Sequence, residues 1–423
     1  MFVAITNTPR PYAWGSSTAI AELLGHSASG GPEAELWLGA HPASPSVIVD
    51  PPLAGGARNL PEWIDADPER TLGEYAAGGR LPFLLKILAA EHPLSLQAHP
   101  TPEQAAAGFA RENALGIPLD APHRNYKDAS AKPELIYALS ETFDALCGFR
   151  PVDEVRTLLL DLLDLDARAE EPQPQPLEDL LQQLSTDDAL PAVFEWLISG
   201  STGVPTLISL VTRLALHSSD PSLQTAAQFA QEYPDDPAIV TSLLLNRVTL
   251  RRGEALYLPA GNIHAYLRGL GVELMAASDN VLRGGLTPKH VDVPELLSVL
   301  DFTPGPAPYL RASGVESPVV GPAGSVGAAG AVDSAGSVGT FGVEVFRPDV
   351  PDFVLVRVAD AGPGAQYPLT GPGIAICTAG EVRIDGAASS VAVGRGESVY
   401  VTPDESLLRF SGDGELFLAT TGK

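Results

Sequence analysis

A short apolar segment of the chain carries two side chains of types that bind metal ions. In "LSLQAHPTPEQ", residues 94–104, Gln97 and His99 lie two positions apart. Residues i and i+2 of a β-strand point to the same face, so a strand here would bring the amide and the imidazole together. A strand end at which these two polar side chains are buried with their hydrogen bonds made, and bind no metal, would give the same pattern. Other parts of the sequence must decide between these two interpretations.

Two distant segments supply side chains that would complete a metal site. Glu134 lies in "AKPELIYAL" and His264 lies in "LPAGNIHAY". Two imidazoles, one carboxylate and one amide oxygen suit Zn²⁺ or another borderline divalent ion. Because a single carboxylate leaves the ion with net positive charge, such a site would act as a Lewis acid.

The elements expected to position these residues change along the chain. Residues 1–150 hold short apolar runs separated by turn signals, and Thr101 is placed to cap a helix. Residues 151–245 carry apolar residues at helical spacing, broken by Pro, Gly and Ser, which predicts a helical insertion. Strand-like sequence then returns. Residues 311–340 are low-complexity Gly, Ala, Ser and Val, which is typical of a linker or mobile loop.

One short sequence occurs twice. "RGEALY" at residues 252–257 is similar to "RGESVY" at residues 395–400, which favours a duplicated β-barrel. Aligning the two copies places His264 opposite Leu407, and no histidine follows His290. The first copy can therefore hold a metal ion through imidazole, and the second cannot.

The composition of the 423-residue chain indicates two or three domains. Its 52 acidic and 26 basic residues give a formal charge of −26, so neither nucleic acid nor an anionic membrane is expected as a partner. Cys147 and Cys377 form neither a disulfide framework nor a metal-ligand spacing, which suits a reducing compartment. With no secretory signal and no apolar run of about 20 residues, a cytoplasmic protein is expected.

Eight segments, in order along the chain, resemble type I mannose-6-phosphate isomerases. They are "YAWGS" (12–16), "LPFLLKIL" (81–88), "PLSLQAHP" (93–100), "NYKD" (125–128), "KPELIYAL" (132–139), "ALCGFRP" (145–151), "GEALYLPAGNIHAY" (253–266) and "GVELMAASDNVLRGGLTPKHVDVPELL" (271–297). The resemblance implies a mainly β fold of two cupin-type, jelly-roll β-barrel domains with a helical insertion domain. The implied domains are a catalytic metal-binding domain (1–150 plus 246–310), the helical insertion (151–245), a linker (311–340) and a metal-free cupin-like domain (341–423).

The resemblance also implies roles for individual residues. Gln97, His99, Glu134 and His264 match the zinc ligands of the family, so one Zn²⁺ per chain is expected, and Arg283 matches its catalytic arginine. Other matches line the family's active-site cleft: Lys132, Tyr266, Glu273, Asp279, Lys289, Ser95, Lys86 and Trp14. The family usually has His-Lys-Pro-Glu where this chain has Ala131-Lys132-Pro133-Glu134. A proton-transfer role of that histidine cannot operate here.

The implied reaction interconverts D-mannose 6-phosphate and D-fructose 6-phosphate, and it links glycolytic sugar phosphate to mannose-derived building blocks such as GDP-mannose. A proton moves between C1 and C2 through a cis-enediol or enediolate, whose charge a divalent metal can stabilise. The candidate bases are Glu273, Lys132 and Asp279. The positive charges expected to hold the phosphate are Arg283, Lys289, Lys86 and Lys132.

Several alternatives stay open on the sequence alone. Glu273 and Asp279 could be ordinary strand-end carboxylates, Tyr266 and Trp14 could be half-buried aromatics, and Arg283 could neutralise Asp279. A sugar-phosphate-binding cupin without turnover would accommodate Ala131. An iron-dependent cupin oxygenase would accommodate two histidines and one carboxylate. The expected partner is a small-molecule sugar phosphate, and a monomer is expected.

Overall fold

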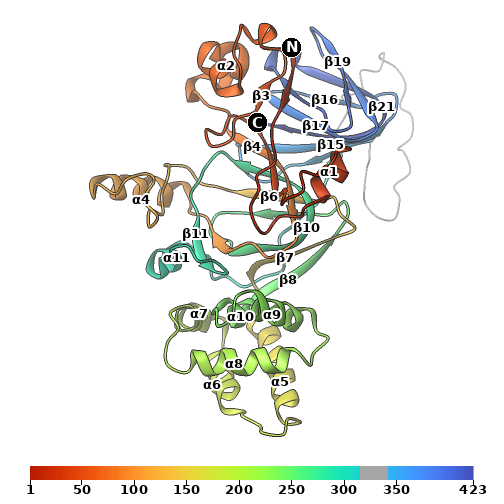
Figure 1. Ribbon diagram of the computed structural model, residues 1–423. Helices are drawn as coiled ribbons and strands as arrows, with labels where there is room; N and C mark the ends of the chain where they lie inside the picture. Colours follow the sequence, from red (N-terminus) through yellow and green to blue (C-terminus); the bar gives the residue numbers. More distant parts are fainter. Residues whose placement is uncertain (315–341, 423) are drawn as a thin grey trace, which may run out of the picture. The chain divides into compact units, whose positions relative to one another are not determined.

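The computed structural model describes residues 1–314 and 342–422 and is mainly β, with antiparallel sheets and several helices (Figure 1). The mainly β prediction is therefore confirmed. The chain divides into two compact units, the first made of Met1–Ala89, Val272–Ala277 and Leu310–Lys423, the second of Ala90–Gly271 and Ser278–Tyr309. Most of the predicted linker, its residues 315–340, lies outside the described residues.

An antiparallel sheet forms the larger part of the first unit. Its strands follow the order β13 (Ser313–Gly314), β14 (Val343–Phe346), β15 (Val354–Ala361), β21 (Leu407–Thr420), β17 (Gly373–Ala379), β20 (Ser398–Val401), β1 (Phe2–Thr6) and β3 (Val47–Ile48). Three further strands pair beside this path: β16 (Gln366–Pro368), β18 (Glu381–Asp385) and β19 (Ser390–Gly394). Because this order does not return to its first strand, a closed barrel is not confirmed among the described strands.

The first unit also contains a two-strand ladder and short helices. Strand β2 (Glu35–Leu38) pairs with β4 (Phe83–Ala90), which places Trp37 opposite Lys86. The helices are α1 (Ala19–Leu24), α2 (Leu60–Ala66) and α3 (Pro68–Leu72). Side chains directly opposite each other on neighbouring strands lie on one face, so this register determines the surroundings of Lys86.

The repeated sequence forms the same turn in both places. Gly253 and Gly396 have φ values of 95° and 85°, a left-handed conformation that glycine adopts without a Cβ clash. The carboxylate of Glu254 accepts the Arg251 N–H at 2.8 Å, and that of Glu397 accepts the Gly394 N–H at 2.8 Å. A strand follows each turn, β9 (Ala255–Leu258) in one copy and β20 in the other. The similarity in sequence is thus also a similarity in local structure.

The second unit contains the strands that carry the candidate metal ligands. These are β5 (Leu96–Ala98), which His99 follows, β6 (Glu134–Ala138) and β10 (His264–Ala276). The other strands are β7 (Thr142–Phe149), β8 (Leu245–Arg251), β9, β11 (Leu282–Gly285) and β12 (Tyr309–Leu310). Strand β5 lies between β10 and β11, and all three run antiparallel to their neighbours. The last residues of β10 belong to the first unit.

Helices pack behind these strands and share a core with them. They are α5 (Val152–Asp166), α6 (Gln175–Gln183), α7 (Leu190–Ile198), α8 (Val204–Ala215), α9 (Pro221–Glu232), α10 (Ala238–Thr241) and α11 (Val293–Val299). Figure 1 shows α5 to α10 as one group near β7 and β8. In α5, Val152, Val155, Leu159 and Leu162 are buried at helical spacing. Because Leu96 and Ala98 of β5 enter the same core, Gln97 between them points to the opposite face.

Helix α4 (Pro102–Ala114) begins where the sequence predicts it. The Thr101 hydroxyl accepts the Gln104 N–H at 3.2 Å, and the Gln104 side chain accepts the Thr101 N–H at 2.9 Å. This reciprocal pair of hydrogen bonds is a capping box. It fixes the start of the helix two residues after His99, so the chain direction after the candidate ligand is set locally.

No helix among the described residues is both long enough and apolar enough to cross a membrane.

Candidate active site and metal centre

Strand register brings three predicted site residues into one row. In the antiparallel ladders, His264 of β10 lies opposite Gln97 of β5, and Gln97 lies opposite Arg283 of β11. Opposite residues project from the same face of a sheet. The imidazole, the amide and the guanidinium therefore leave three neighbouring strands on one side, with the apolar core on the other.

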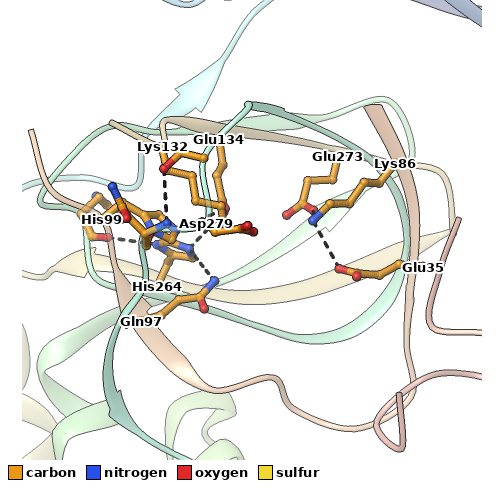
Figure 2. A network of polar contacts seen from close by, with 12 residues as sticks. Glu35, Lys86, Gln97, His99, Lys132, Glu134, His264, Glu273 and Asp279 are labelled. Atoms are coloured by element: carbon orange, nitrogen blue, oxygen red, sulfur yellow. Dashed lines mark hydrogen bonds and ion pairs between the residues drawn. The ribbon is translucent and has the colours of Figure 1, made fainter. Parts of the chain in front are cut away.

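His99, Glu134 and His264 form a closely packed group (Figure 2). The Nε2 atom of His99 lies 3.2 Å from Glu134 Oε1, and that of His264 lies 3.2 Å from Glu134 Oε2. The candidate ligand atoms all lie within 4.8 Å of one another. Each of the three residues is only 1% exposed. The group is thus held inside the protein.

Backbone carbonyls determine which imidazole nitrogens carry protons. His99 Nδ1 lies 2.7 Å from the Asn280 carbonyl oxygen, and His264 Nδ1 lies 3.0 Å from that of Asn262. A carbonyl can only accept, so each Nδ1–H donates, and a neutral imidazole in this orientation has its lone pair on Nε2. Hydrogen bonds of this kind orient the histidine ligands of metal sites.

The resulting arrangement fits a divalent cation. Two nitrogen lone pairs face two carboxylate oxygens, so an acceptor meets an acceptor in each contact. Within the described part of the chain, neither His99 Nε2 nor Glu134 Oε2 has a hydrogen-bond partner. A buried polar atom without a partner is destabilising, and a cation among these atoms would remove that cost. Two imidazoles and a carboxylate are also ligands that Zn²⁺ prefers.

The charges of the group suit metal binding as well. Burial lowers the pKa of His99 to about 4, against the opposing effect of Glu134, so the imidazole is neutral at pH 7. Burial acts to raise the pKa of Glu134, but the Lys132 ammonium and the imidazoles hold it well below its ordinary range. Neutral imidazoles and an ionised carboxylate are the forms that bind metal ions.

Two further polar side chains touch this group. The Gln97 amide nitrogen lies 3.4 Å from His264 Nε2, and a half-turn of the amide puts its oxygen there instead, so Gln97 can offer an oxygen ligand. The Lys132 ammonium lies 3.0 Å from Glu134 Oε1 and is buried. The ring of Tyr266 lies 6.0 Å from that of His264, and its residue is 2% exposed.

Arg283 and Lys289 are cations without a carboxylate partner among residues 1–314 and 342–422. The Arg283 guanidinium is half-buried, and this burial lowers its pKa. Burial and the charge of Arg283 lower the pKa of Lys289. The interpretation that Arg283 neutralises Asp279 stays untested, and burial is the cause that lowers the pKa of Arg283. Two adjacent cations that repel each other form a place where an anion would be stabilised.

The remaining members of the predicted site in this unit are more exposed. Asp279 is exposed, and its backbone N–H donates to the Asp128 carboxylate at 2.9 Å. Ser95 is half-buried just before β5. Lys127, which sequence reasoning did not select, has its pKa lowered by burial and by the charges of neighbours that include Arg283. Its ammonium donates to the Leu119 carbonyl at 2.7 Å.

Lys86, Glu273 and Trp14 belong to the first unit. The buried Lys86 ammonium lies 2.8 Å from Glu273 and 3.5 Å from Glu35, contacts that Figure 2 also draws. The Trp37 indole N–H donates to Glu35 at 2.8 Å, and Lys86 lies over the Trp37 ring. Lys86, which the sequence places among the cations for the phosphate, is thus paired with two carboxylates.

Trp14 stacks on the ring of Tyr12, with ring centroids 5.8 Å apart. Sequence reasoning did not select Glu35 or Asn280. Glu35 is adjacent to no other candidate in sequence, and its contact with Lys86 arises from strand pairing. Asn280 follows Asp279 directly, but nothing in its spacing indicated that it is fully buried.

Comparison with known proteins identifies the family of the chain. A family model described as "Phosphomannose isomerase type I, catalytic domain" matches residues 2–152. The mannose-6-phosphate isomerase of Escherichia coli (strain K12) is 35% identical over 420 residues, covering 97% of both chains. The human mannose-6-phosphate isomerase is 33% identical, over 84% of this chain and 81% of that protein.

Solved structures give the same result over the whole chain. A crystal structure of mannose 6-phosphate isomerase bound with zinc and yttrium has a TM-score of 0.83 and 33% identity, and covers all of both chains. The apo form from Salmonella typhimurium also has a TM-score of 0.83 at 33% identity, over 100% of this chain and 99% of that one. The chain therefore belongs to the type I phosphomannose isomerase family.

Proposed function

We propose that this protein interconverts mannose 6-phosphate and fructose 6-phosphate. The observation that carries the proposal is the buried His99–Glu134–His264 group, of which His264 lies in one strand row with Gln97 and Arg283. The reaction needs both stabilisation of charge on sugar oxygens and a cation for the phosphate. Both occur in the second unit of a chain that belongs to this isomerase family.

We propose Gln97, His99, Glu134 and His264 as the ligands of one Zn²⁺. When bound, zinc supplies Lewis-acid stabilisation of the oxygen atoms on the reacting carbons. Arg283 and Lys289 are proposed to hold the phosphate, since both are cations without a carboxylate partner among the described residues. An arginine can make two parallel hydrogen bonds to phosphate, so Arg283 would also orient the sugar.

The proton transfer is assigned to a side-chain base. The candidates are Glu273, Lys132 and Asp279, with Tyr266 as a further catalytic residue and Lys86, Ser95 and Trp14 as substrate-binding residues. Lys132 and Asp279 belong to the same unit as the metal ligands. The 2.8 Å ion pair with Lys86 fixes the Glu273 carboxylate in position, which a base requires. Lys86 would therefore hold the Glu273 carboxylate in position as well as bind the substrate.

The finer description of the fold is part of the same proposal. Two cupin-type jelly-roll domains are supported by the repeated turn before β9 and β20. The domain limits predicted above, with a helical insertion at 151–245, differ from the two compact units mainly because β1 pairs with β20.

A cytoplasmic location is supported by Cys147 and Cys377, which are both free and buried. One chain is proposed to suffice, since it carries every group the reaction requires.

Metal removal tests the reaction and the site together. Chelation of the purified protein is expected to abolish conversion of mannose 6-phosphate, and added Zn²⁺ is expected to restore it, because the buried acceptors of His99 and Glu134 need a cation. The measurement is fructose 6-phosphate formation, with metal content determined in parallel. A fully zinc-loaded protein that binds the sugar phosphate without converting it would contradict the proposal and favour a binding protein, in which Ala131 replaces a required histidine.

The fate of the C2 hydrogen tests the proton-transfer route. Mannose 6-phosphate labelled with deuterium at C2 is expected to lose label to water during turnover, because a base that holds the proton can exchange it with solvent. Mass spectrometry of the product measures the label, and chelated enzyme provides the control for exchange without turnover. Complete retention of deuterium at C1 of the product would indicate a hydride shift, for which no base is needed.

A further inference from the structure

Asn280 makes an unusually complete set of hydrogen bonds for a side-chain amide. It is 0% exposed. Its Oδ1 accepts the N–H groups of Lys127 at 2.7 Å and Asp128 at 3.2 Å. Its Nδ2 donates to the carbonyls of Asp128 and Ser130, both at 2.8 Å. One buried amide thus holds the backbone of residues 127–130.

Asp128 makes the reverse connection. Its carboxylate accepts the Asp279 N–H at 2.9 Å and the Ser278 hydroxyl at 3.0 Å. It also accepts the Ser130 N–H at 2.8 Å, which tightens its own loop. Residues 127–130 and 278–280 are therefore tied together from both sides, although about 150 residues separate them in sequence. Asn280, Asp128 and the hydrogen bonds that they make between these two segments form the Asn280–Asp128 clasp.

The clasp is connected to the candidate metal site at two points. The backbone carbonyl of Asn280 accepts the His99 Nδ1–H at 2.7 Å, which sets the orientation of that imidazole. At the other side, the chain that leaves residues 127–130 continues directly to Lys132 and Glu134, which lie 3.0 Å apart. A shift of the clasp would thus move one imidazole and the carboxylate relative to each other.

We propose that Asn280 and Asp128 are positioning residues that set the geometry of His99 and Glu134 for metal binding. The clasp fixes the loop before Glu134 through the backbone of residues 127, 128 and 130, so the side chain at position 131 takes no part in it. This explains how the chain can place Lys132 and Glu134 with alanine at position 131. The inference rests on the proposed metal site. It assigns a positioning role to two residues that are not themselves metal ligands.

Metal affinity and ligand-field spectroscopy test the clasp directly. Asn280→Ala is expected to bind Zn²⁺ about 10- to 100-fold more weakly than the unaltered protein, the usual effect of losing a group that orients a histidine ligand. Affinity is measured by competition with a chromophoric chelator. The absorption spectrum of the Co²⁺-substituted variant is expected to change as well, because His99 and Glu134 are no longer held in the same geometry.

Asn246→Ala is the matched control. The Asn246 amide also donates to three backbone carbonyls, those of Gly148, Phe149 and Gly305, in the same unit. The Asn246→Ala variant is expected to lower the melting temperature of the metal-free protein, as Asn280→Ala does. It is expected to leave the Zn²⁺ affinity and the Co²⁺ spectrum unchanged. Equal effects of the two variants on affinity, or no effect of Asn280→Ala, would overturn the proposal.

Asp128→Asn keeps the test decisive if Asn280→Ala does not fold. This variant keeps the size of the side chain but replaces one acceptor oxygen by an NH₂ group, which then faces the Ser130 or the Asp279 N–H. A weaker Zn²⁺ affinity with unchanged secondary structure would support the clasp, and unchanged affinity would overturn it. An unaltered protein that binds Zn²⁺ but does not isomerise would contradict the proposed function alone. An unaltered protein that binds no Zn²⁺ would contradict both.

Discussion

Glu134→Gln is expected to lose its zinc and to lower isomerase activity by about 10³-fold, since Lewis-acid stabilisation contributes several kcal/mol to such reactions. Glu134 supplies the carboxylate of the candidate ligand set; its Oε1 lies 3.2 Å from His99 Nε2, and its Oε2 lies 3.2 Å from His264 Nε2. Glutamine removes the charge and puts an NH₂ group where one oxygen faces a lone pair. Zinc per chain after gel filtration and fructose 6-phosphate formation are the measurements.

Glu112→Gln provides the control for this experiment. Glu112 is 5% exposed, lies in the same unit, and accepts the N–H groups of Asn125 and Tyr126 at 3.0 and 2.9 Å. The same substitution there is expected to lower thermal stability and to leave the zinc content unchanged. Full zinc content and full activity in Glu134→Gln would exclude Glu134 as a ligand. Equal zinc loss in both variants would point to a general effect of burying an amide.

Arg283→Met is expected to lower kcat/KM for mannose 6-phosphate by on the order of 10²–10³-fold, since two hydrogen bonds to a charged group contribute about 3–4 kcal/mol. The guanidinium is half-buried, has no carboxylate partner among the described residues, and is carried by the strand next to Gln97. Methionine keeps much of the side-chain volume but removes the charge and all donors. Arg283→Lys is expected to recover part of the loss, because an ammonium is a point charge without the planar pair of donors.

Unphosphorylated mannose separates phosphate binding from catalysis in this series. If Arg283 holds the phosphate, turnover of mannose, which has no phosphate to bind, should hardly change in Arg283→Met. An equal loss with both sugars would instead place the guanidinium at the reacting carbons. Arg268→Met is the control, because Arg268 is an exposed arginine of the same unit that pairs with Glu91 at 3.0 Å. Its kcat/KM should match that of the unaltered protein.

Features that depend on neighbouring residues could be predicted from the sequence. The alternation of Leu96, Gln97 and Ala98 separates a core face from a polar face, and the structure places Leu96 and Ala98 in the core. The capping box at Thr101 and the helical spacing in α5 are likewise present. Each of these follows from strand or helix periodicity, or from hydrogen bonds within one turn of chain. Similar short-range rules explain the repeated Arg-Gly-Glu turn.

Contacts between distant segments could not be predicted in the same way. The sequence places Lys86 among the cations for the phosphate, but the pairing of β2 with β4 and the position of Glu273 surround it with carboxylates. Asn280 was not selected at all, because its hydrogen bonds reach residues about 150 positions away. The pairing of β1 with β20 joins two N-terminal strands, β1 and its neighbour β3, to a sheet of C-terminal strands.

The sequence by itself determined which residue types are available for chemistry: two imidazoles, a carboxylate, an amide and a small set of cations on an acidic chain. It also determined the local elements that carry them and, through its motifs, the family. Only the tertiary structure decided that His264, Gln97 and Arg283 share one strand row, and that a backbone carbonyl accepts from the Nδ1–H of each imidazole. The physical reason is that strand register and burial result from packing of the whole chain, whereas periodicity, capping and turn formation are decided within a few residues.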